Sequence, residues 1–142
     1  MPQLCAYLSF DGDCAEAMAF YAKVLDAKLE ALITFGQMPD GDPVPPEHAD
    51  KIMHAYLAHP DFALMAGDTP PGMPFDGMKG VMMALTYPGV ADAERVFNAL
   101  AQGGTVQMPL AATFWAATFG MLTDRFGTAW AVNGGPKEMR PT

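Results

Sequence analysis

The sequence predicts an α+β fold built from two βαβββ modules that follow one another in the chain. Each half contains one segment with the apolar spacing of an amphipathic helix, accompanied by several short apolar segments typical of strands. The order of strand, helix and three strands occurs twice, with an offset of about 75 residues. Because one helix and four short strands cannot bury both faces of a sheet, we expect the two sheets to curl and enclose a cleft.

The first half opens with a strand and a helix. Residues 4–10 are apolar and end in Asp-Gly, which predicts a buried strand and a turn. Asp13 and Glu16 form a variant of the capping box, in which Asp13 accepts backbone N–H groups and Glu16 reaches back from the first turn. The expected apolar face of the helix that begins there comprises Ala17, Phe20, Tyr21, Val24 and Leu25.

The remainder of the first half predicts three strands and a long loop. Residues 29–35 form a strand candidate, and residues 51–58 and 62–66 form a hairpin. Between them, residues 36–50 contain four prolines and several acidic residues, a composition that excludes a central strand or a helix. Two interpretations of this loop stay open: a lid over a binding site, or a disordered surface excursion.

The second half repeats the order after a proline-rich break. We expect strands at 81–87, 105–110, 119–123 and 128–132, and a helix at 90–102 that ends at Gly103-Gly104. The apolar face of this helix comprises Ala93, Val96, Phe97 and Leu100. The chain is thus interpreted as one domain, 1–142, with module 1 at about 1–67, a linker at about 68–78, module 2 at about 79–136 and a tail at 137–142.

Composition excludes several classes of function. Hydrophobic residues make up 51% of the chain and charged residues 17%, so a full core is expected. The formal charge of −8 disfavours nucleic acid and membrane surfaces as partners. The sequence shows no signal peptide and no apolar run long enough to span a bilayer, and its two cysteines favour a reducing cytoplasm. Walker A, GxGxxG, GxSxG and HExxH motifs are also lacking.

A set of spaced segments covers nearly the full length of the chain. It consists of YLSFDGDCAEA (7–17), LITFG (32–36), His54-Ala55, FNALA (97–101) leading to Gly103-Gly104-Thr105, TFW (113–115) and FGMLTDRFG (119–127) with Trp130 and Asn133. In these segments the sequence resembles the vicinal oxygen chelate superfamily of glyoxalase I, bleomycin-resistance proteins and extradiol dioxygenases. More narrowly, it resembles the PhnB-like branch, whose members often carry a 3-demethylubiquinone methyltransferase label. No S-adenosylmethionine loop supports that label here.

The resemblance also implies where a metal would bind. Metal-dependent members hold a divalent ion with four His, Glu or Gln side chains, taken from strands of both modules. The matching positions in this sequence are Cys5 or Ala6, His54 or Tyr56, Val81 or Met82, and Ala131. At most two of these could bind an ion, fewer than catalytic zinc or iron sites use, so neither a complete metal site nor a cofactor is expected.

Several single residues have two interpretations. His54 is either a half-buried strand histidine satisfied by a neighbour, or a hydrogen-bonding or proton-transfer group in the cleft. His48 and His59 are expected to be solvated. Cys14 is expected to be a small buried residue rather than an activated thiol at a helix N-terminus, whereas Trp130 is expected in the core.

Candidate ligand contacts lie on the expected strands and near the cleft mouth. Cys5 faces either the cleft or the core, and Trp115 either stacks on a ligand or packs in the core. Twelve methionines favour an apolar, adaptable cleft; Met38, Met73 and Met78 fall in the proline-rich segments. The candidate ligand-binding residues are Cys5, Tyr7, His54, Tyr56, Met82, Trp115 and Met121.

We therefore expect a PhnB-like protein that binds a small apolar or zwitterionic molecule in the module cleft without a complete metal site. The alternative is a glyoxalase- or dioxygenase-like enzyme on a small metabolite, with His54 as an acid, a base or a partial metal ligand. A third possibility is an interaction protein whose cleft is vestigial. The resemblance further implies a homodimer, which would cover exposed strand edges.

Overall fold

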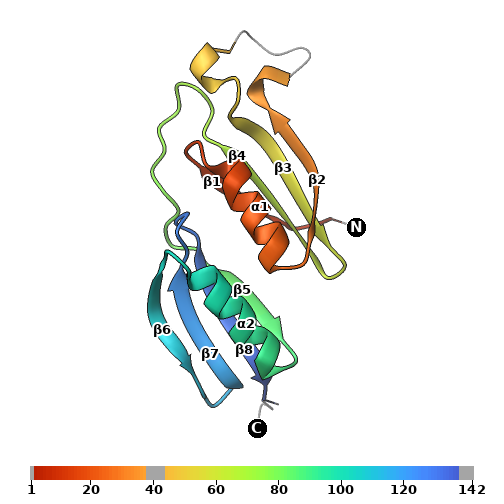
Figure 1. Cartoon of the computed structure of the whole chain (residues 1–142), viewed down its shortest axis with the longest axis vertical. Coiled ribbons are helices and arrows are strands. Elements are labelled where there is room, and N and C mark those ends of the chain that lie inside the picture. Colours follow the sequence, from red (N-terminus) through yellow and green to blue (C-terminus); the bar gives the residue numbers. More distant parts are fainter. Residues whose placement is uncertain (1, 38–43, 138–142) are drawn as a thin grey trace. The chain divides into compact units, whose positions relative to one another are not determined.

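The computed structural model describes residues 2–37 and 44–137. Two compact units divide the chain, Met1–Gly77 and Met78–Thr142, here called module 1 and module 2. Both contain a strand, a helix and three further strands in that order, so the predicted α+β class with two βαβββ modules is confirmed (Figure 1). No helix of the described part is long and apolar enough to cross a membrane.

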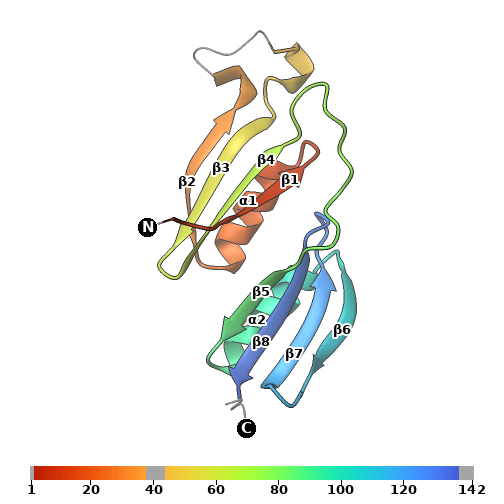
Figure 2. The same ribbon diagram turned by 180° about the vertical axis from the view of Figure 1, so that it is seen from behind.

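Module 1 is a mixed four-stranded sheet with one helix. Its elements are β1 (Ala6–Phe10), α1 (Cys14–Val24), β2 (Lys28–Thr34), β3 (Ile52–His59) and β4 (Phe62–Asp68). The strand order is β1-β4-β3-β2, with β1 parallel to β4 and the other pairs antiparallel. The helix covers one face of this sheet (Figure 2). The hairpin predicted at residues 51–58 and 62–66 is confirmed, because β3 and β4 are consecutive antiparallel strands.

The N-terminus of α1 is held by a distant carboxylate instead of the predicted capping box. Asp13 stands at the N-cap position, but its side chain makes no capping hydrogen bond. Asp68, at the end of β4, accepts hydrogen bonds from the backbone N–H groups of Gly12 at 2.7 Å and Cys14 at 3.1 Å. The expectation that the Asp13 side chain caps the helix is wrong, and the carboxylate that does bind the start of α1 comes from β4, far away in the sequence.

The predicted long loop contains two short 3-10 turns. They are η1 (Phe35–Gln37), which directly follows β2, and η2 (Pro46–His48). Residues 38–43, with Met38, lie outside the described part of the chain, as do residues 138–142 of the expected tail. The lid interpretation of residues 36–50 therefore stays a prediction.

Module 2 repeats the architecture with the same strand order. Its elements are β5 (Met83–Tyr87), α2 (Val90–Ala101), β6 (Thr105–Ala111), β7 (Ala116–Thr123) and β8 (Ala129–Pro136). The order is β5-β8-β7-β6, with β5 parallel to β8. All four residues expected on the apolar face of α2 are buried, as is Trp130 at 2% exposure, so those predictions are confirmed.

Two features fix module 2 internally. A Cβ at Gly134 would lie 2.6 Å from the Cβ of Ala93, so only glycine lets α2 approach β8 this closely. In the β7–β8 turn, the buried Asp124 accepts hydrogen bonds from the backbone N–H groups of Phe126 and Thr128 and from Nε1 of Trp130. The Asp124 carboxylate thus stabilises the turn and also binds the indole of Trp130, the largest core side chain of this module.

Candidate functional site

The sheet of module 1 has one face under α1 and one face without a helix. Along β1, buried Leu8 and Phe10 alternate with exposed Tyr7 and Ser9, as expected for a half-covered sheet. The register places Tyr7 beside Met65 on β4, and Met65 beside Tyr56 on β3. We call the uncovered side the open face of module 1; it carries Tyr7, Ser9, His54, Tyr56, Met65 and Gly67.

Tyr7 and His54 form a pair on this open face. The Tyr7 hydroxyl donates to the carbonyl oxygen of Met53 at 3.2 Å and lies 3.5 Å from Nδ1 of His54. The two rings stack with centroids 5.9 Å apart and an interplanar angle of 26°. Burial, followed by the charge of the Cys14 thiolate, raises the pKa of Tyr7. The phenol therefore stays protonated at neutral pH and remains a donor.

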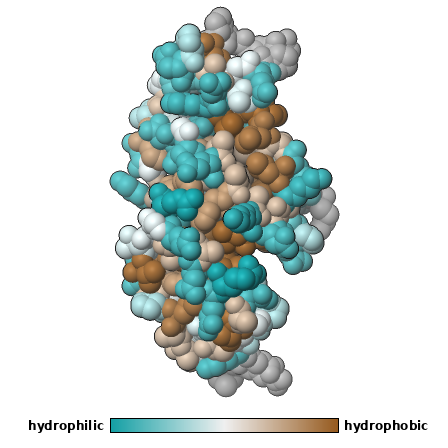
Figure 3. Space-filling model, in the orientation of Figure 1, coloured by the Kyte–Doolittle hydropathy of each residue, from teal (hydrophilic) through white to brown (hydrophobic). Residues whose placement is uncertain are grey.

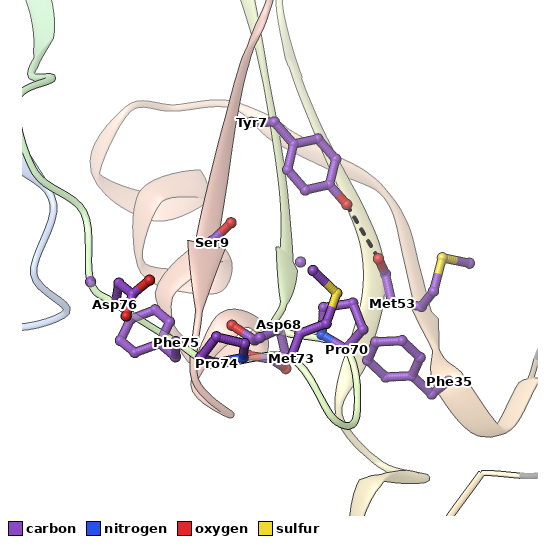
Figure 4. A pocket seen from close by; sticks show the side chains of 13 residues that line it. Tyr7, Ser9, Phe35, Met53, Asp68, Pro70, Met73, Pro74, Phe75 and Asp76 are labelled. Atoms are coloured by element: carbon purple, nitrogen blue, oxygen red, sulfur yellow. Dashed lines mark hydrogen bonds between the residues drawn. The ribbon is translucent and has the colours of Figure 1, made fainter.

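A pocket of about 430 Å³ adjoins this pair. Its walls come from β1, η1, the start of β3, the end of β4, and the segment that follows β4 (Figure 4). The lining residues are Tyr7, Ser9, Phe35, Met53, Gly67, Asp68, Thr69, Pro70, Met73, Pro74, Phe75, Asp76 and Gly77. The residues expected only to link the modules thus form one wall of a cavity.

The lining of this pocket is mainly apolar. Three aromatic rings (Tyr7, Phe35 and Phe75) and two thioethers (Met53 and Met73) supply its larger side chains. Phe35 is buried at 8% exposure, whereas Phe75 and Met73 are exposed at 39% and 62%. The pocket therefore has a fixed inner end and a more accessible wall on the linker.

The charged groups in the lining are two carboxylates. Asp68 is 4% exposed, and besides its bonds to Gly12 and Cys14 it accepts from the backbone N–H of Ile52 at 2.8 Å. Asp76 lies on the linker beside Phe75 (Figure 4). Hydrogen bonds from three backbone donors satisfy both carboxylate oxygens of Asp68 in this buried position.

Two of the sequence-predicted contacts lie in module 2. Trp115 donates from Nε1 to Oδ1 of Asn133 at 3.0 Å and packs against Phe119 with ring centroids 5.2 Å apart. Phe114, exposed at 75%, contacts the edge of the same indole. Met121 is half-buried and pairs with Ala131 on β8. The hydrogen bond to Asn133 and the contact with Phe119 thus orient the Trp115 ring, and its other aromatic neighbour, Phe114, is exposed to solvent.

The other predicted residues occupy separate environments. Cys5, just before β1, is half-buried, and its thiol donates to the carbonyl of Ala63 at 3.2 Å. Tyr56 shares the open face with Tyr7 but is not part of the pocket lining, and Met82 is exposed ahead of β5. Of the seven candidates, only Tyr7 lines the pocket. His54 is not in the lining, but its Nδ1 contacts the Tyr7 hydroxyl.

Several functional candidates were missed in the sequence. Asp68, Met73, Phe75 and Asp76 were assigned to a linker because of their proline-rich surroundings. One signal was available in the sequence. Large apolar residues such as Met73 and Phe75 in a proline-rich segment indicate that the segment packs against other residues or contributes to a binding site. Exposed hydrophobic side chains also interrupt the polar surface elsewhere (Figure 3).

Three expectations about histidines and cysteines can be compared with the structure. His48 and His59 are half-buried, so the expectation that both are solvated is wrong. His59 stacks on Phe62 with centroids 4.3 Å apart, which removes one ring face from water. Cys14 is fully buried as predicted, and burial, with the Asp68 and Asp13 carboxylates, raises the pKa of its thiol to about 12.

The donor set does not fit a resident divalent ion. Ala131 and Ala6 offer no ligand atom, and the Cys5 thiol is already engaged with a backbone carbonyl. Across residues 2–37 and 44–137, no three His, Cys, Asp or Glu side chains gather in a group able to hold a metal. The arrangement instead offers an apolar pocket, a phenol, a neighbouring imidazole and two carboxylates.

Comparison with known proteins places this geometry in context. Residues 4–132 match the Glyoxalase/Bleomycin resistance protein/Dioxygenase superfamily. The chain is 34% identical to Protein YjdN of Escherichia coli K12 over 140 residues, which covers 92% of this chain and 93% of that protein.

Solved structures agree with the sequence matches. The crystal structure of protein PA1353 from Pseudomonas aeruginosa is 52% identical, with a TM-score of 0.87 over 94% of this chain and 97% of that one. A Bacillus cereus PhnB protein, described as a putative 3-demethylubiquinone-9 3-methyltransferase, superposes with a TM-score of 0.76 at 23% identity. It covers 93% of this chain and 98% of its own, and at that identity it shows the shared fold alone.

Proposed function

Because the chain belongs to the glyoxalase/bleomycin resistance protein/dioxygenase superfamily, we propose that it binds a small apolar or zwitterionic molecule without a complete metal site. The binding site in this proposal is the pocket of module 1. The observation that carries it is the cavity of about 430 Å³, lined by aromatic rings and thioethers with a few polar groups at fixed positions. Ligand pockets in proteins commonly have this volume and this composition.

The lining suits a ligand with an apolar body. Phe35, Met53 and Met73 present carbon and sulfur surface, and methionine side chains adapt to irregular shapes. The Tyr7 hydroxyl and Ser9 provide hydrogen-bonding groups on the β1 side of the pocket (Figure 4). This combination supports binding of an organic molecule more than it supports chelate chemistry.

A thermal-shift screen of metabolites tests this proposal. A molecule present at 100 times its dissociation constant should stabilise the folded chain by about 2.7 kcal/mol. The stabilisation should be lost in Met73→Ala and Phe75→Ala, two exposed side chains of the pocket, and kept in the control Met108→Ala, which is exposed on β6. Retention of the full shift in both pocket variants would refute the assignment of the site. Stoichiometric zinc, manganese or iron in untagged protein would refute the metal-free part.

A second candidate function uses the Tyr7–His54 contact. The approach of the Tyr7 hydroxyl to Nδ1 of His54 at 3.5 Å favours a role for His54 as an acid or base toward a molecule bound on the open face. Mass-spectrometric detection of metabolite turnover by the native chain, abolished in His54→Gln, would support this enzyme. Turnover that persists in His54→Gln would remove His54 from the reaction.

The partner and location proposals are broader. Each sheet leaves two edge strands, β1 and β2 in module 1, β5 and β6 in module 2, and a homodimer would cover part of this unpaired backbone. Light scattering at micromolar concentration tests it, since a monomer mass would contradict a dimer. Both cysteines are free, which is compatible with the proposed cytoplasmic location.

A further inference from the structure

The pocket of module 1 combines negative charge with aromatic surface. Two of its lining residues are carboxylates, Asp68 and Asp76, and in the described part of the chain no Lys, Arg or His lines it. An anionic ligand would therefore enter a cavity that holds two like charges and no opposing one. Such an arrangement costs free energy for an anion and lowers it for a cation.

The Asp68 charge is fixed in place by the fold. Its two oxygens accept three backbone hydrogen bonds, from Gly12, Cys14 and Ile52, at 2.7 to 3.1 Å. Neither Asp68 nor Asp76 forms an ion pair with any side chain of the described residues. No side-chain cation of residues 2–37 and 44–137 therefore faces these carboxylates, and the three backbone N–H groups oppose only part of the Asp68 charge, so a ligand can supply a full positive charge.

The aromatic rings offer a second attraction to the same kind of ligand. Tyr7 comes from β1, Phe35 from η1 and Phe75 from the linker, so three different segments bring ring surface to one cavity. Ring faces carry partial negative charge and attract organic cations, most strongly where water is excluded. The formal charge of −8 on the whole chain adds a long-range field of the same sign.

From these observations we propose that the pocket takes an organic cation, an alkyl or aryl ammonium compound whose apolar body contacts the aromatic and methionine side chains. The proposal rests on the proposed function of a small-molecule site in this pocket, and it assigns the ligand a positively charged group on an apolar body. The ammonium group would be balanced by Asp68 and Asp76, and the body would lie against Phe35, Met53 and Met73. A neutral isostere would keep the apolar contacts and lose the electrostatic ones.

Three probes of nearly equal shape separate charge from burial: phenyltrimethylammonium, tert-butylbenzene and benzenesulfonate. The full chain, labelled with ¹³C at its methionine methyl groups, reports binding through the resonances of Met53 and Met73, while methionines outside the pocket serve as internal references. We expect the cation to shift those two resonances, with a dissociation constant about threefold to tenfold lower than that of tert-butylbenzene. The sulfonate should leave them unchanged.

Substitution of the exposed carboxylate identifies the source of the preference. Asp76→Asn should weaken binding of phenyltrimethylammonium by about threefold to tenfold and leave tert-butylbenzene unaffected. The matched control, Glu94→Gln, lies exposed on α2 outside the pocket and should change neither. Equal melting temperatures of the two variants would establish that each is folded.

The possible failures are distinguishable. If tert-butylbenzene or the sulfonate binds as tightly as the cation, or if Asp76→Asn leaves cation binding unchanged, the charge assignment is wrong while the pocket remains a binding site. If none of the three probes shifts Met53 or Met73, the organic cation is likewise excluded. The proposed function itself is then decided by the metabolite screen and its Met73→Ala and Phe75→Ala variants.

Discussion

The two modules have the same strand order, but they carry different residues at the position beside the end of their first strand. In the parallel pair of module 1, the last residue of β1, Phe10, stands beside Asp68; in module 2, the last residue of β5, Tyr87, stands beside Gly134. Asp68 uses its carboxylate to hold the start of α1, whereas Gly134 uses its lack of a side chain to admit Ala93 of α2. The duplicated fold therefore fixes its helix by hydrogen bonding in one module and by close packing in the other.

This difference also separates the modules in the position of the proposed site. The carboxylate at the equivalent position lines a pocket in module 1, and the following segment, through Gly77, completes its wall. The buried carboxylate of module 2, Asp124, is placed in the β7–β8 turn and holds Trp130. Repetition of a fold thus does not imply repetition of a site.

The largest expected effect comes from Asp68→Ala. Three backbone N–H groups lose their acceptor, two of them in buried hydrogen bonds, and we expect the free energy of unfolding to fall by about 4 kcal/mol. Urea denaturation measures the loss. Asp61→Ala, whose side chain is 87% exposed, should change stability by less than about 0.5 kcal/mol. A loss below 1 kcal/mol in Asp68→Ala would show that water replaces the carboxylate.

Gly134→Ala tests the packing device of module 2. The added methyl group would approach the Cβ of Ala93 to 2.6 Å and Cγ2 of Thr118 to 3.0 Å, so α2 must move away from the sheet. We expect a loss of about 2 kcal/mol in the free energy of unfolding. A Cβ at Gly89 meets no atom within 4 Å, and Gly89→Ala should therefore cost less than about 1 kcal/mol. Equal losses in the two variants would argue against the packing explanation.

The thiol of Cys14 predicts a pH dependence that belongs to module 1. A thiol with its pKa raised from 9.0 to about 12 stabilises the folded state below pH 9 and loses that contribution as the pH rises through 12. The difference in unfolding free energy between the native chain and Cys14→Ala should therefore shrink by up to about 1.4 kcal/mol per pH unit in this range. Urea titrations from pH 7 to 11 measure it, and a constant difference would contradict a raised pKa.

The smallest effect is expected from Trp115→Phe in module 2. The substitution removes the hydrogen bond from Nε1 to Asn133 and keeps an aromatic ring, at a cost of about 1 kcal/mol. Phenyltrimethylammonium should still shift the Met53 and Met73 resonances. Loss of that shift in a folded variant would mean that module 2 contributes to the binding site, and the functional contrast between the modules would fail.

Sequence patterns predicted the fold better than the site, for a physical reason. The helix faces and the buried Trp130 follow from local periodicity, and strand alternation along β1 places Tyr7 on the side opposite buried Leu8 and Phe10. Asp68 escaped notice because its partners stand 16 to 56 residues away in sequence. A hydrogen bond across the fold leaves no local pattern, and neither does a loop that closes a pocket.

The parallel pairing of β1 with β4 has a consequence for synthesis of the chain. β1 is synthesised early, but its partner β4 ends at Asp68. Ala6–Phe10 therefore cannot pair until most of module 1 has been synthesised. The backbone N–H groups of Gly12 and Cys14 likewise lack this acceptor until Asp68 has been synthesised. A ribosome-bound chain that stops short of Phe62 should therefore remain open to proteases, and one that extends well beyond Asp68 should acquire protection in a single step.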